Sequence, residues 1–389
     1  MRSDAVNISH SSRHPLLRLF GFEVKIDASW ILLALLIVWT LAAGLFPYTY
    51  PGMAEGTYWW MAVVGAAGIF LSIVFHELSH SLVARRFGTT IKGITLFIFG
   101  GVAEMEDEPP DPKAEFLMAG AGPVSSFVLA LIFFGLSRLG EAVPWPESAV
   151  GVLAYLSYLN FILATFNIVP AFPLDGGRML RAVLWQWKRR LTDATRIAST
   201  IGRGFAWLLM IAGGIAFFRG NFIGGMWWFL IGLFLRGAAV NSYRQVVVRE
   251  LLQGEPISRM MTSAPVTVTP DVPLQQLVDD YIYGHHLRMF PVVDHDRLLG
   301  WVTLQDVREV PRGKWRRRTV GEVVRPCTPE NTVPPDADSA DVLSQMSRPG
   351  APGRVMVAES QRLAGVVSLK DLRSFITLKL DLEAGNRRR

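Results

Sequence analysis

The chain has 389 residues, of which 50% are hydrophobic and 19% charged, and its formal net charge is +6. Its single cysteine, Cys327, excludes an intramolecular disulfide and a thiolate metal cluster, so any metal must be bound by His, Asp or Glu. The length favours two or three domains. Because apolar residues gather before residue 240 and acidic residues after it, we expect a membrane part followed by a soluble part.

Residues 1–27 are expected to form an uncleaved cytoplasmic segment, because they carry basic side chains but no apolar core of signal-peptide length. Uncharged stretches long enough to cross a bilayer, about 20 residues, follow at residues 28–47, 57–75, 116–136 and 149–174. Two shorter stretches, 204–218 and 220–235, are interpreted as two further spans, although one broken hairpin would also fit. The sequence therefore predicts a six-span membrane domain over residues 28–245.

The basic residues indicate the orientation of these spans. Lys and Arg cluster after the second and fourth apolar stretches, whereas the opposite loops hold only Arg138 and Arg219. Loops rich in Lys and Arg stay on the cytoplasmic side of a membrane. We therefore expect a multi-pass protein of the cell membrane with both termini in the cytoplasm. The same pattern explains the positive net charge as a topology signal, so no nucleic-acid partner is expected.

Residues 91–105 read IKGITLFIFGGVAEM, a β-branched and aromatic run that contains Gly100 and Gly101. This run is too short to span a bilayer as a helix. We predict a short membrane-embedded β-hairpin, because backbone that is not helical is tolerated at membrane depth where protein covers it or it lines a cavity.

The chain after residue 245 contains a tandem repeat with α/β character. Six residues recur at a separation of 65, which indicates two copies of one unit. They are Asp271, Val292, Gly300, Thr303, Leu304 and Asp306, repeated as Asp336, Val357, Gly365, Ser368, Leu369 and Asp371. The expected boundaries are a linker at residues 246–255, a first copy at 256–312, a second at 313–376 and a basic tail at 377–389.

The sequence HELSH supplies the first metal ligands. On a helix, His76 and His80 lie four residues apart and share one face, with Glu77 beside them. Catalytic zinc takes three protein ligands and leaves a fourth position for water, whose pKa it lowers to about 7. Glu77 is then the expected general base, which leaves one ligand to be found. The alternative is a chance helix with two hydrogen-bonded histidines.

Asp175 is the expected third ligand, in the segment NIVPAFPLDGGR. Pro170 and Pro173 break the fourth span there, and the two glycines allow close backbone approach. The second and fourth spans both end on the cytoplasmic side, which brings Asp175 to a depth similar to that of His80. The alternative role for Asp175 is N-cap of a helix over residues 178–187.

HELSH inside one apolar stretch, followed by NIVPAFPLDGGR at the end of another, resembles the site-2 protease family of intramembrane zinc metalloproteases. The resemblance implies that His76, His80 and Asp175 bind one Zn²⁺ and that Glu77 activates water. It also implies that Asn167 helps to stabilise the oxyanion. The expected activity is regulated intramembrane proteolysis, in which a peptide bond is hydrolysed within or near a transmembrane helix of a membrane-protein substrate.

Two further segments resemble parts of the same family. Residues 120–126, GAGPVSS, are similar to its Gly-Pro motif, with Ser126 where Asn is common, which implies that Ser126 supports the oxyanion or the substrate. The strand region with Gly100 and Gly101 is expected to receive unwound substrate as an added strand.

The repeat resembles a pair of cytosolic CBS domains through the segments GWVTLQD and GVVSLKD. Several such pairs bind adenine nucleotides, which implies Thr303, Asp306, Ser368 and Asp371 as ligand contacts and nucleotide as a regulator. Purely structural pairing of the copies is the alternative, and a homodimer is a further expectation. For the whole protein, the alternatives are a CBS-gated membrane transporter and a non-catalytic membrane-helix-binding protein.

Overall fold

The computed structural model describes residues 14–19, 22–26, 28–89, 91–97, 100–105, 108–348, 351 and 353–386. The chain divides into two compact units, Met1–Arg244 and Gln245–Arg389, which are described separately.

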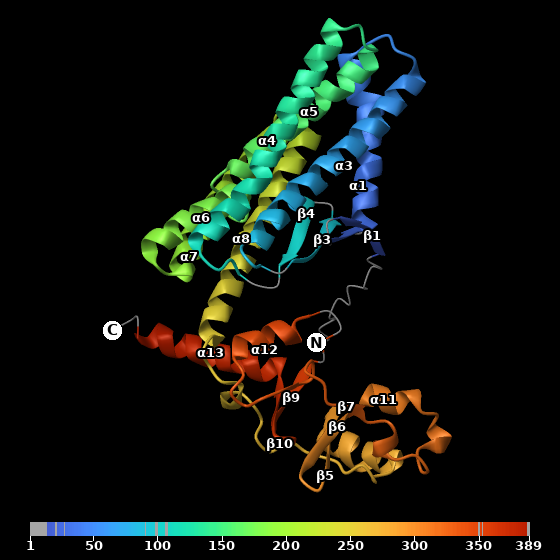
Figure 1. The fold of residues 1–389 in the computed structure, drawn as a ribbon, viewed down its shortest axis with the longest axis vertical. Helices are drawn as coiled ribbons and strands as arrows, with labels where there is room; N and C mark the ends of the chain where they lie inside the picture. Colours follow the sequence, from blue (N-terminus) through green and yellow to red (C-terminus); the bar gives the residue numbers. More distant parts are fainter. Residues whose placement is uncertain are drawn as a thin grey trace. The chain divides into compact units, whose positions relative to one another are not determined.

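Helices form most of the first unit (Figure 1). They are α1 (Ala28–Thr40), η1 (Leu41–Leu45), α2 (Phe46–Thr49), α3 (Glu55–Arg86), α4 (Pro112–Ala142), α5 (Glu147–Ile168), α6 (Asp175–Lys188), α7 (Leu191–Phe218) and α8 (Phe222–Leu252). Among the described residues, six helical segments are long and apolar enough to cross a membrane: the α1–α2 segment, α3, α4, α5, α7 and α8. The expected six spans are confirmed, and the last two are longer than their apolar stretches.

The outer surfaces of these helices are strongly apolar. Leu32, Leu35 and Leu131 expose 67, 65 and 55% of their area, respectively. Large continuous apolar surfaces are rare on soluble monomers, and helices that are apolar on all sides are typical of membrane spans. The exposed side chains are therefore the surface that faces lipid.

Helix α4 is central to the packing of the first unit, because it contacts α3, α5 and α6. A second packed region joins the first span to α3 and α5 through the buried side chains of Phe46, Met61 and Leu156. Helix α5 ends at Ile168, two residues before Pro170, as expected because the residue before a proline is disfavoured in the helical conformation.

The expected hairpin is present as β3 (Ile91–Phe97) and β4 (Gly100–Met105), which pair antiparallel and lie against α3. They belong to a four-stranded sheet of order β1-β2-β3-β4. The two strands β1 (His14–Leu19) and β2 (Phe22–Ile26) were not expected from the sequence. β2 pairs parallel with β3, far along the chain, so its partner is not visible in local sequence. The depth of the hairpin in the membrane stays a prediction.

The second unit confirms the tandem repeat. The hairpin of β5 (Met289–Asp294) and β6 (Arg297–Thr303) recurs 65 residues later as β9 (Arg354–Glu359) and β10 (Arg362–Ser368). Each hairpin leads into a helix, α11 (Leu304–Glu309) or α13 (Leu369–Asn386). The remaining elements are η2 (Ile257–Arg259), α9 (Leu274–Gln276), η3 (Leu277–Ile282), α10 (Tyr283–His285), η4 (Arg312–Lys314), η5 (Val320–Glu322), β7 (Arg325–Pro326), β8 (Thr332–Val333) and α12 (Ser339–Met346).

The two copies exchange the segments that precede them. β7 leads into the second copy but pairs antiparallel with β6 of the first. Thr262 leads into the first copy but forms an antiparallel bridge with Val366 of the second. A shared cluster of apolar side chains closes the contact: Met289, Leu298, Trp301, Met356 and Val366. The copies therefore complete one another's sheets.

Two expected boundary segments are partly helical. Residues 246–252 of the expected linker belong to α8, and residues 377–386 of the expected basic tail belong to α13. Arg387, Arg388 and Arg389 lie outside the described residues.

Glycine at position 202 allows α7 to contact the loop before α6. A Cβ atom at Gly202 would lie 2.0 Å from the Phe172 carbonyl oxygen, whereas one at Gly204 would meet no atom within 4 Å. Gly202→Ala is therefore expected to destabilise the protein by about 1–3 kcal/mol, as overpacking does. The measurement is thermal unfolding in detergent, with Gly204→Ala as the control. Equal unfolding temperatures in the two variants would contradict this packing.

Candidate metal centre

Helix α3 positions two histidines on the same face. His76 and His80 are one helical turn apart, and only 4% and 8% of their surfaces are exposed. Their ring centroids are 4.8 Å apart, with the ring planes inclined by 79°. The helical spacing therefore brings two imidazoles into one buried space, as the sequence HELSH predicts.

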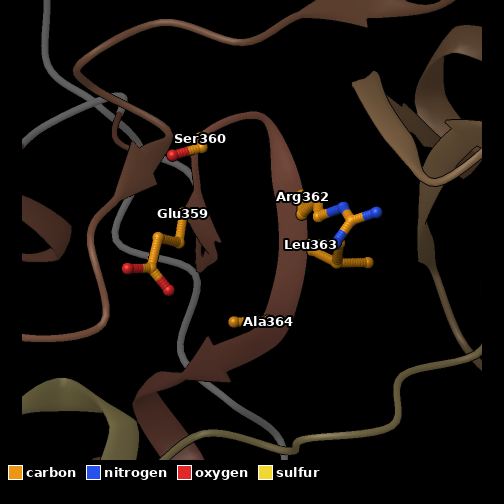
Figure 2. A pocket seen from close by; sticks show the side chains of 5 residues that line it. All are labelled: Glu359, Ser360, Arg362, Leu363 and Ala364. Carbon is orange, nitrogen blue, oxygen red and sulfur yellow. The ribbon is translucent and has the colours of Figure 1, made fainter.

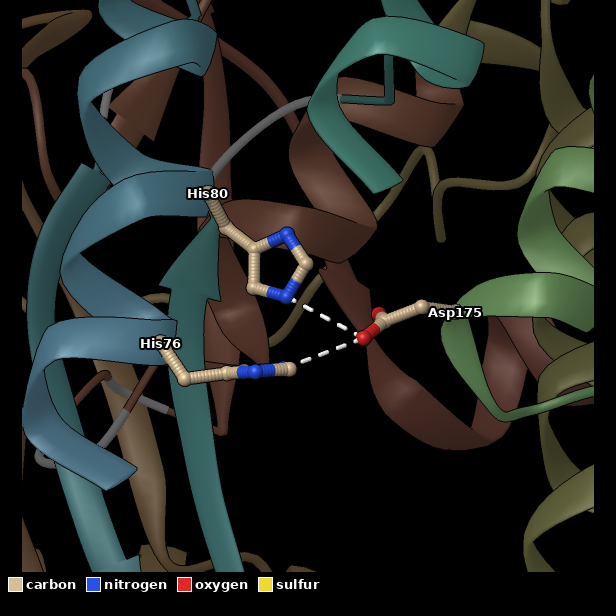
Figure 3. A group of neighbouring side chains, drawn as sticks. All are labelled: His76, His80 and Asp175. Carbon is tan, nitrogen blue, oxygen red and sulfur yellow. Dashed lines mark hydrogen bonds and ion pairs between the residues drawn. The ribbon is translucent and has the colours of Figure 1, made fainter. Parts of the chain in front are cut away.

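Asp175, the first residue of α6, meets both rings. Its Oδ2 atom lies 3.1 Å from His76 Nε2 and 3.2 Å from His80 Nε2 (Figure 3). All three residues are buried, and their ligand atoms lie within 4.8 Å of one another. We call these three residues the metal centre.

The alternative role of Asp175 as a helix cap is not observed. Helix α6 begins at Asp175 itself, its N-cap is Leu174, and no side-chain hydrogen bond caps it. The carboxylate instead points toward the two imidazoles, as Figure 3 shows.

The neighbouring helix α4 orients both imidazoles. His80 Nδ1 donates to the Met118 carbonyl oxygen at 2.6 Å, so the proton is on Nδ1 and the Nε2 lone pair faces the metal centre. His76 Nδ1 lies 2.8 Å from the Ser126 hydroxyl. Such outer hydrogen bonds fix the ring orientation of histidines that bind metals.

Glycine at position 122 of α4 leaves space beside the metal centre. A Cβ atom there would lie 2.1 Å from His80 Nε2 and 2.5 Å from His76 Nε2. Two oriented imidazole nitrogens, one carboxylate oxygen and this clearance suit a divalent ion that accepts nitrogen and oxygen ligands, such as zinc. The side chains thus fit a metal ion with three protein ligands.

Glu77 lies beside the metal centre without belonging to it. It is partly exposed, whereas both histidines are buried. The charged groups around it are His80, His76, Asp175 and Arg178. A carboxylate next to a metal site and still accessible is suited to accept a proton from water.

The described contacts of Asn167, Gly100 and Gly101 are with residues outside the metal centre. Asn167 is on the last turn of α5, where its side-chain amide donates to the Leu163 carbonyl oxygen at 3.0 Å. Gly100 and Gly101 begin β4 and pair with Phe97 and Leu96. Their expected roles toward substrate stay predictions.

In the CBS pair, the four expected ligand residues form two local caps. Thr303 and Asp306 form a capping box at the start of α11. Ser368 and Asp371 hydrogen-bond in the same way at the start of α13, with 2.6 Å between Ser368 Oγ and Asp371 Oδ2. These contacts account for the repeated sequence structurally, whether or not a ligand binds.

A surface pocket of about 300 Å³ lies at the turn between β9 and β10. It is lined by Glu359, Ser360, Arg362, Leu363 and Ala364 (Figure 2). The Glu359 and Arg362 side chains project to different sides of the hairpin. The pocket therefore lacks the convergent polar groups that are typical of a small-molecule site.

The sequence did not reveal two contributions from α4. The Met118 carbonyl is a backbone group, so its side chain gives no signal. Gly122 belongs to the segment GAGPVSS, whose resemblance to a family motif did not indicate that its neighbours would be the ligand nitrogens.

Comparison with known proteins identifies two families in this chain. The model of peptidase family M50 matches residues 64–142 and 142–212, and the CBS domain model matches residues 257–313 and 320–378. Rip3 of Mycobacterium tuberculosis, which its name describes provisionally as a zinc metalloprotease, is 32% identical over 93% of this chain and 92% of its own.

A curated protein and a solved structure from one archaeon are also similar. The zinc metalloprotease MJ0392 of Methanocaldococcus jannaschii is 32% identical over 81% of this chain and 86% of its own. The solved structure of a site-2 protease from the same organism is 29% identical, covers 60% of this chain and 95% of its own, and has a TM-score of 0.42.

Apolar helices around a buried cluster of two histidines and a carboxylate define a multi-pass membrane metalloprotease. The chain belongs to peptidase family M50 and carries two tandem CBS domains. The family expected from the HELSH and LDGG segments is thereby confirmed.

Filling the space at Gly122 is expected to abolish metal binding. Gly122→Ala would place a methyl group against both Nε2 atoms, whereas a Cβ at Gly120, on the same helix, would meet Met179 only at ordinary contact distance, 3.8 Å. Elemental analysis of the purified variants measures the bound metal, with Gly120→Ala as the control. Full metal content in Gly122→Ala would show that the ion does not occupy this space.

Proposed function

We propose that this protein is an intramembrane zinc protease that hydrolyses peptide bonds within or near the transmembrane helices of other membrane proteins. His76, His80 and Asp175 hold the zinc ion, and Glu77 is the general base. The observation that carries the proposal is the approach of one Asp175 oxygen to both Nε2 atoms, at 3.1 and 3.2 Å. The names of the similar proteins, which include zinc metalloproteases, support the choice of metal.

The proposed chemistry divides the work between the ion and the side chains. A bound zinc ion supplies Lewis acidity, which lowers the pKa of water in such sites to about 7. Glu77 accepts the proton of the attacking water and returns it to the nitrogen of the departing amine. The two histidines keep their orientation through this exchange, because α4 hydrogen-bonds both imidazoles. Asn167 is the proposed donor to the developing oxyanion.

The substrate enters as an extended strand in this proposal. A helical peptide bond is shielded by its own hydrogen bonds, and unwinding it at membrane depth leaves polar groups that need partners. β4 is an edge strand of its sheet and lies against α3, the helix that carries both histidines. Among the described strands, none pairs with the outer edge of β4, which begins at Gly100 and Gly101, and this edge offers those partners by strand addition.

Removing the base tests the catalytic assignment. Glu77→Gln keeps the size of the side chain but cannot take up a proton, so cleavage should fall by at least about 100-fold while zinc stays bound. The assay is cleavage of a tagged transmembrane-helix substrate by protein in lipid, combined with elemental analysis. Glu55→Gln, at the exposed first turn of the same helix, is the control. Wild-type cleavage by Glu77→Gln would falsify the assigned role.

Family membership speaks against a CBS-gated transporter, and the same assay separates the remaining alternative. A non-catalytic helix-binding protein would retain the substrate helix but leave it intact, in the parent as in Glu77→Gln.

We propose that both termini lie in the cytoplasm, because basic residues follow the second and fourth spans. The homodimer stays a sequence-based expectation.

We further propose that an adenine nucleotide binds the second CBS copy rather than the first. In the first copy, Arg325 Nε donates to Asp306 Oδ1 at 2.5 Å, so a cation already occupies that carboxylate. By strand register the counterpart of Arg325 in the second copy is Thr262, which carries no charge. Within the described chain, Asp371 keeps an oxygen without a cationic partner, which supports its availability to a ribose hydroxyl.

Nucleotide binding to the full-length protein tests this asymmetry. Asp371→Asn should weaken adenine nucleotide binding by about 10-fold, the cost of one charge-assisted hydrogen bond. Asp306→Asn, the matched change in the first copy, should leave the affinity unchanged. Titration calorimetry with ATP and AMP measures both. Equal losses in the two variants, or no binding by the parent, would remove this proposal.

A further inference from the structure

A buried ion pair joins α4 to α6 close to the metal centre. Glu115 on α4 has no exposed surface, and the Arg181 side chain on α6 is 6% exposed. Arg181 Nε donates to Glu115 Oε1 at 2.6 Å, and a second guanidinium nitrogen contacts the same oxygen. Glu108 lies further out, 3.6 Å from the guanidinium and 33% exposed. Burying two charges is costly unless they are paired, so this pair constrains how the two helices meet.

The same face of α4 contacts both histidines of the metal centre and the helix that carries its third ligand. Glu115, Met118, Gly122 and Ser126 are spaced by three or four residues, which aligns them along one side of a helix. Met118 and Ser126 hold the two histidines, and Gly122 gives them space. Glu115 makes the corresponding contact with α6, whose first residue is the third ligand. Helix α4 thus sets the position of α3 and α6 against one another.

Arg181 also holds the loop that delivers Asp175. Its guanidinium lies over the Phe172 ring, 5.1 Å from the ring centroid. Phe172 is itself enclosed by backbone, because a Cβ at Gly177 would lie 2.2 Å from its nitrogen. Asp175 lies between these two anchored points, Phe172 before it and Arg181 after it. A shift of α6 along α4 would therefore carry the carboxylate away from the imidazoles.

We propose that the Glu115–Arg181 pair is a positioning device that sets the distance of Asp175 from the two histidines and thereby the zinc affinity. The pair touches neither zinc nor substrate. The inference rests on the proposed function, because it requires that the three residues of the metal centre bind zinc. A purely structural pair would stabilise the fold without affecting the geometry of the metal centre.

Replacing both charges with apolar side chains distinguishes a positioning role of the pair from a purely structural role. Removal of one partner leaves a buried charge and destabilises a protein whatever the pair does, but an apolar pair of similar volume is often tolerated or even stabilising. The test variant is therefore Glu115→Leu with Arg181→Met in the full chain. The control is Glu108→Gln, which neutralises the outer carboxylate.

Three measurements are made on the parent and these variants: thermal unfolding of the zinc-free protein, zinc affinity by chelator competition, and kcat and KM for a transmembrane-helix substrate. We expect the double variant to unfold at a temperature no lower than the parent, to bind zinc about 10–100-fold more weakly, and to lose kcat with little change in KM. Glu108→Gln should match the parent in all three.

A folded double variant with parental zinc affinity and kcat would overturn the inference. If the double variant does not fold, Glu115→Asp decides, since it keeps both charges but shortens the link by one methylene. Unchanged zinc affinity in Glu115→Asp would again overturn it, and a weaker affinity would support it. Absence of zinc from the parent would instead refute the proposed function.

Discussion

One carboxylate oxygen between two imidazole nitrogens is the contact on which the first unit depends. Burying a charge is costly unless it is paired, so the buried carboxylate of Asp175 is tolerated because its neighbours compensate for it. Those neighbours come from α3, and α4 in turn holds them through Met118 and Ser126. The long apolar helices therefore do more than cross the bilayer, because their packing brings three polar side chains together.

The residues of the metal centre could be predicted because their signals are local. The spacing of His76 and His80 fixes a shared helical face, and prolines and glycines around Asp175 mark a break where a backbone can approach closely. Asp175 could be paired with the histidines only through topology, by placing both span ends at one membrane depth. Neither argument gave distances, which depend on how α6 meets α4.

Features that depend on distant partners escaped prediction. The strand β2 alternates apolar and charged residues over only five positions, and it is stabilised by β3, a strand far along the chain. Arg325 is similar: nothing in its own surroundings indicates that it would reach Asp306. The ion pair of Glu115 and Arg181 joins two helices whose contact was not foreseen.

Neither CBS copy is complete without the other, because the segment that precedes each copy pairs with the sheet of the other, and this constrains how the unit can evolve. Since β7 completes the sheet of the other copy, and Thr262 does the same in return, a single copy made alone would have an open edge and no partner for its apolar cluster. Open edges favour aggregation. Loss of one repeat by deletion would therefore be more harmful than loss of the whole pair. The two copies are expected to be kept or lost together during evolution.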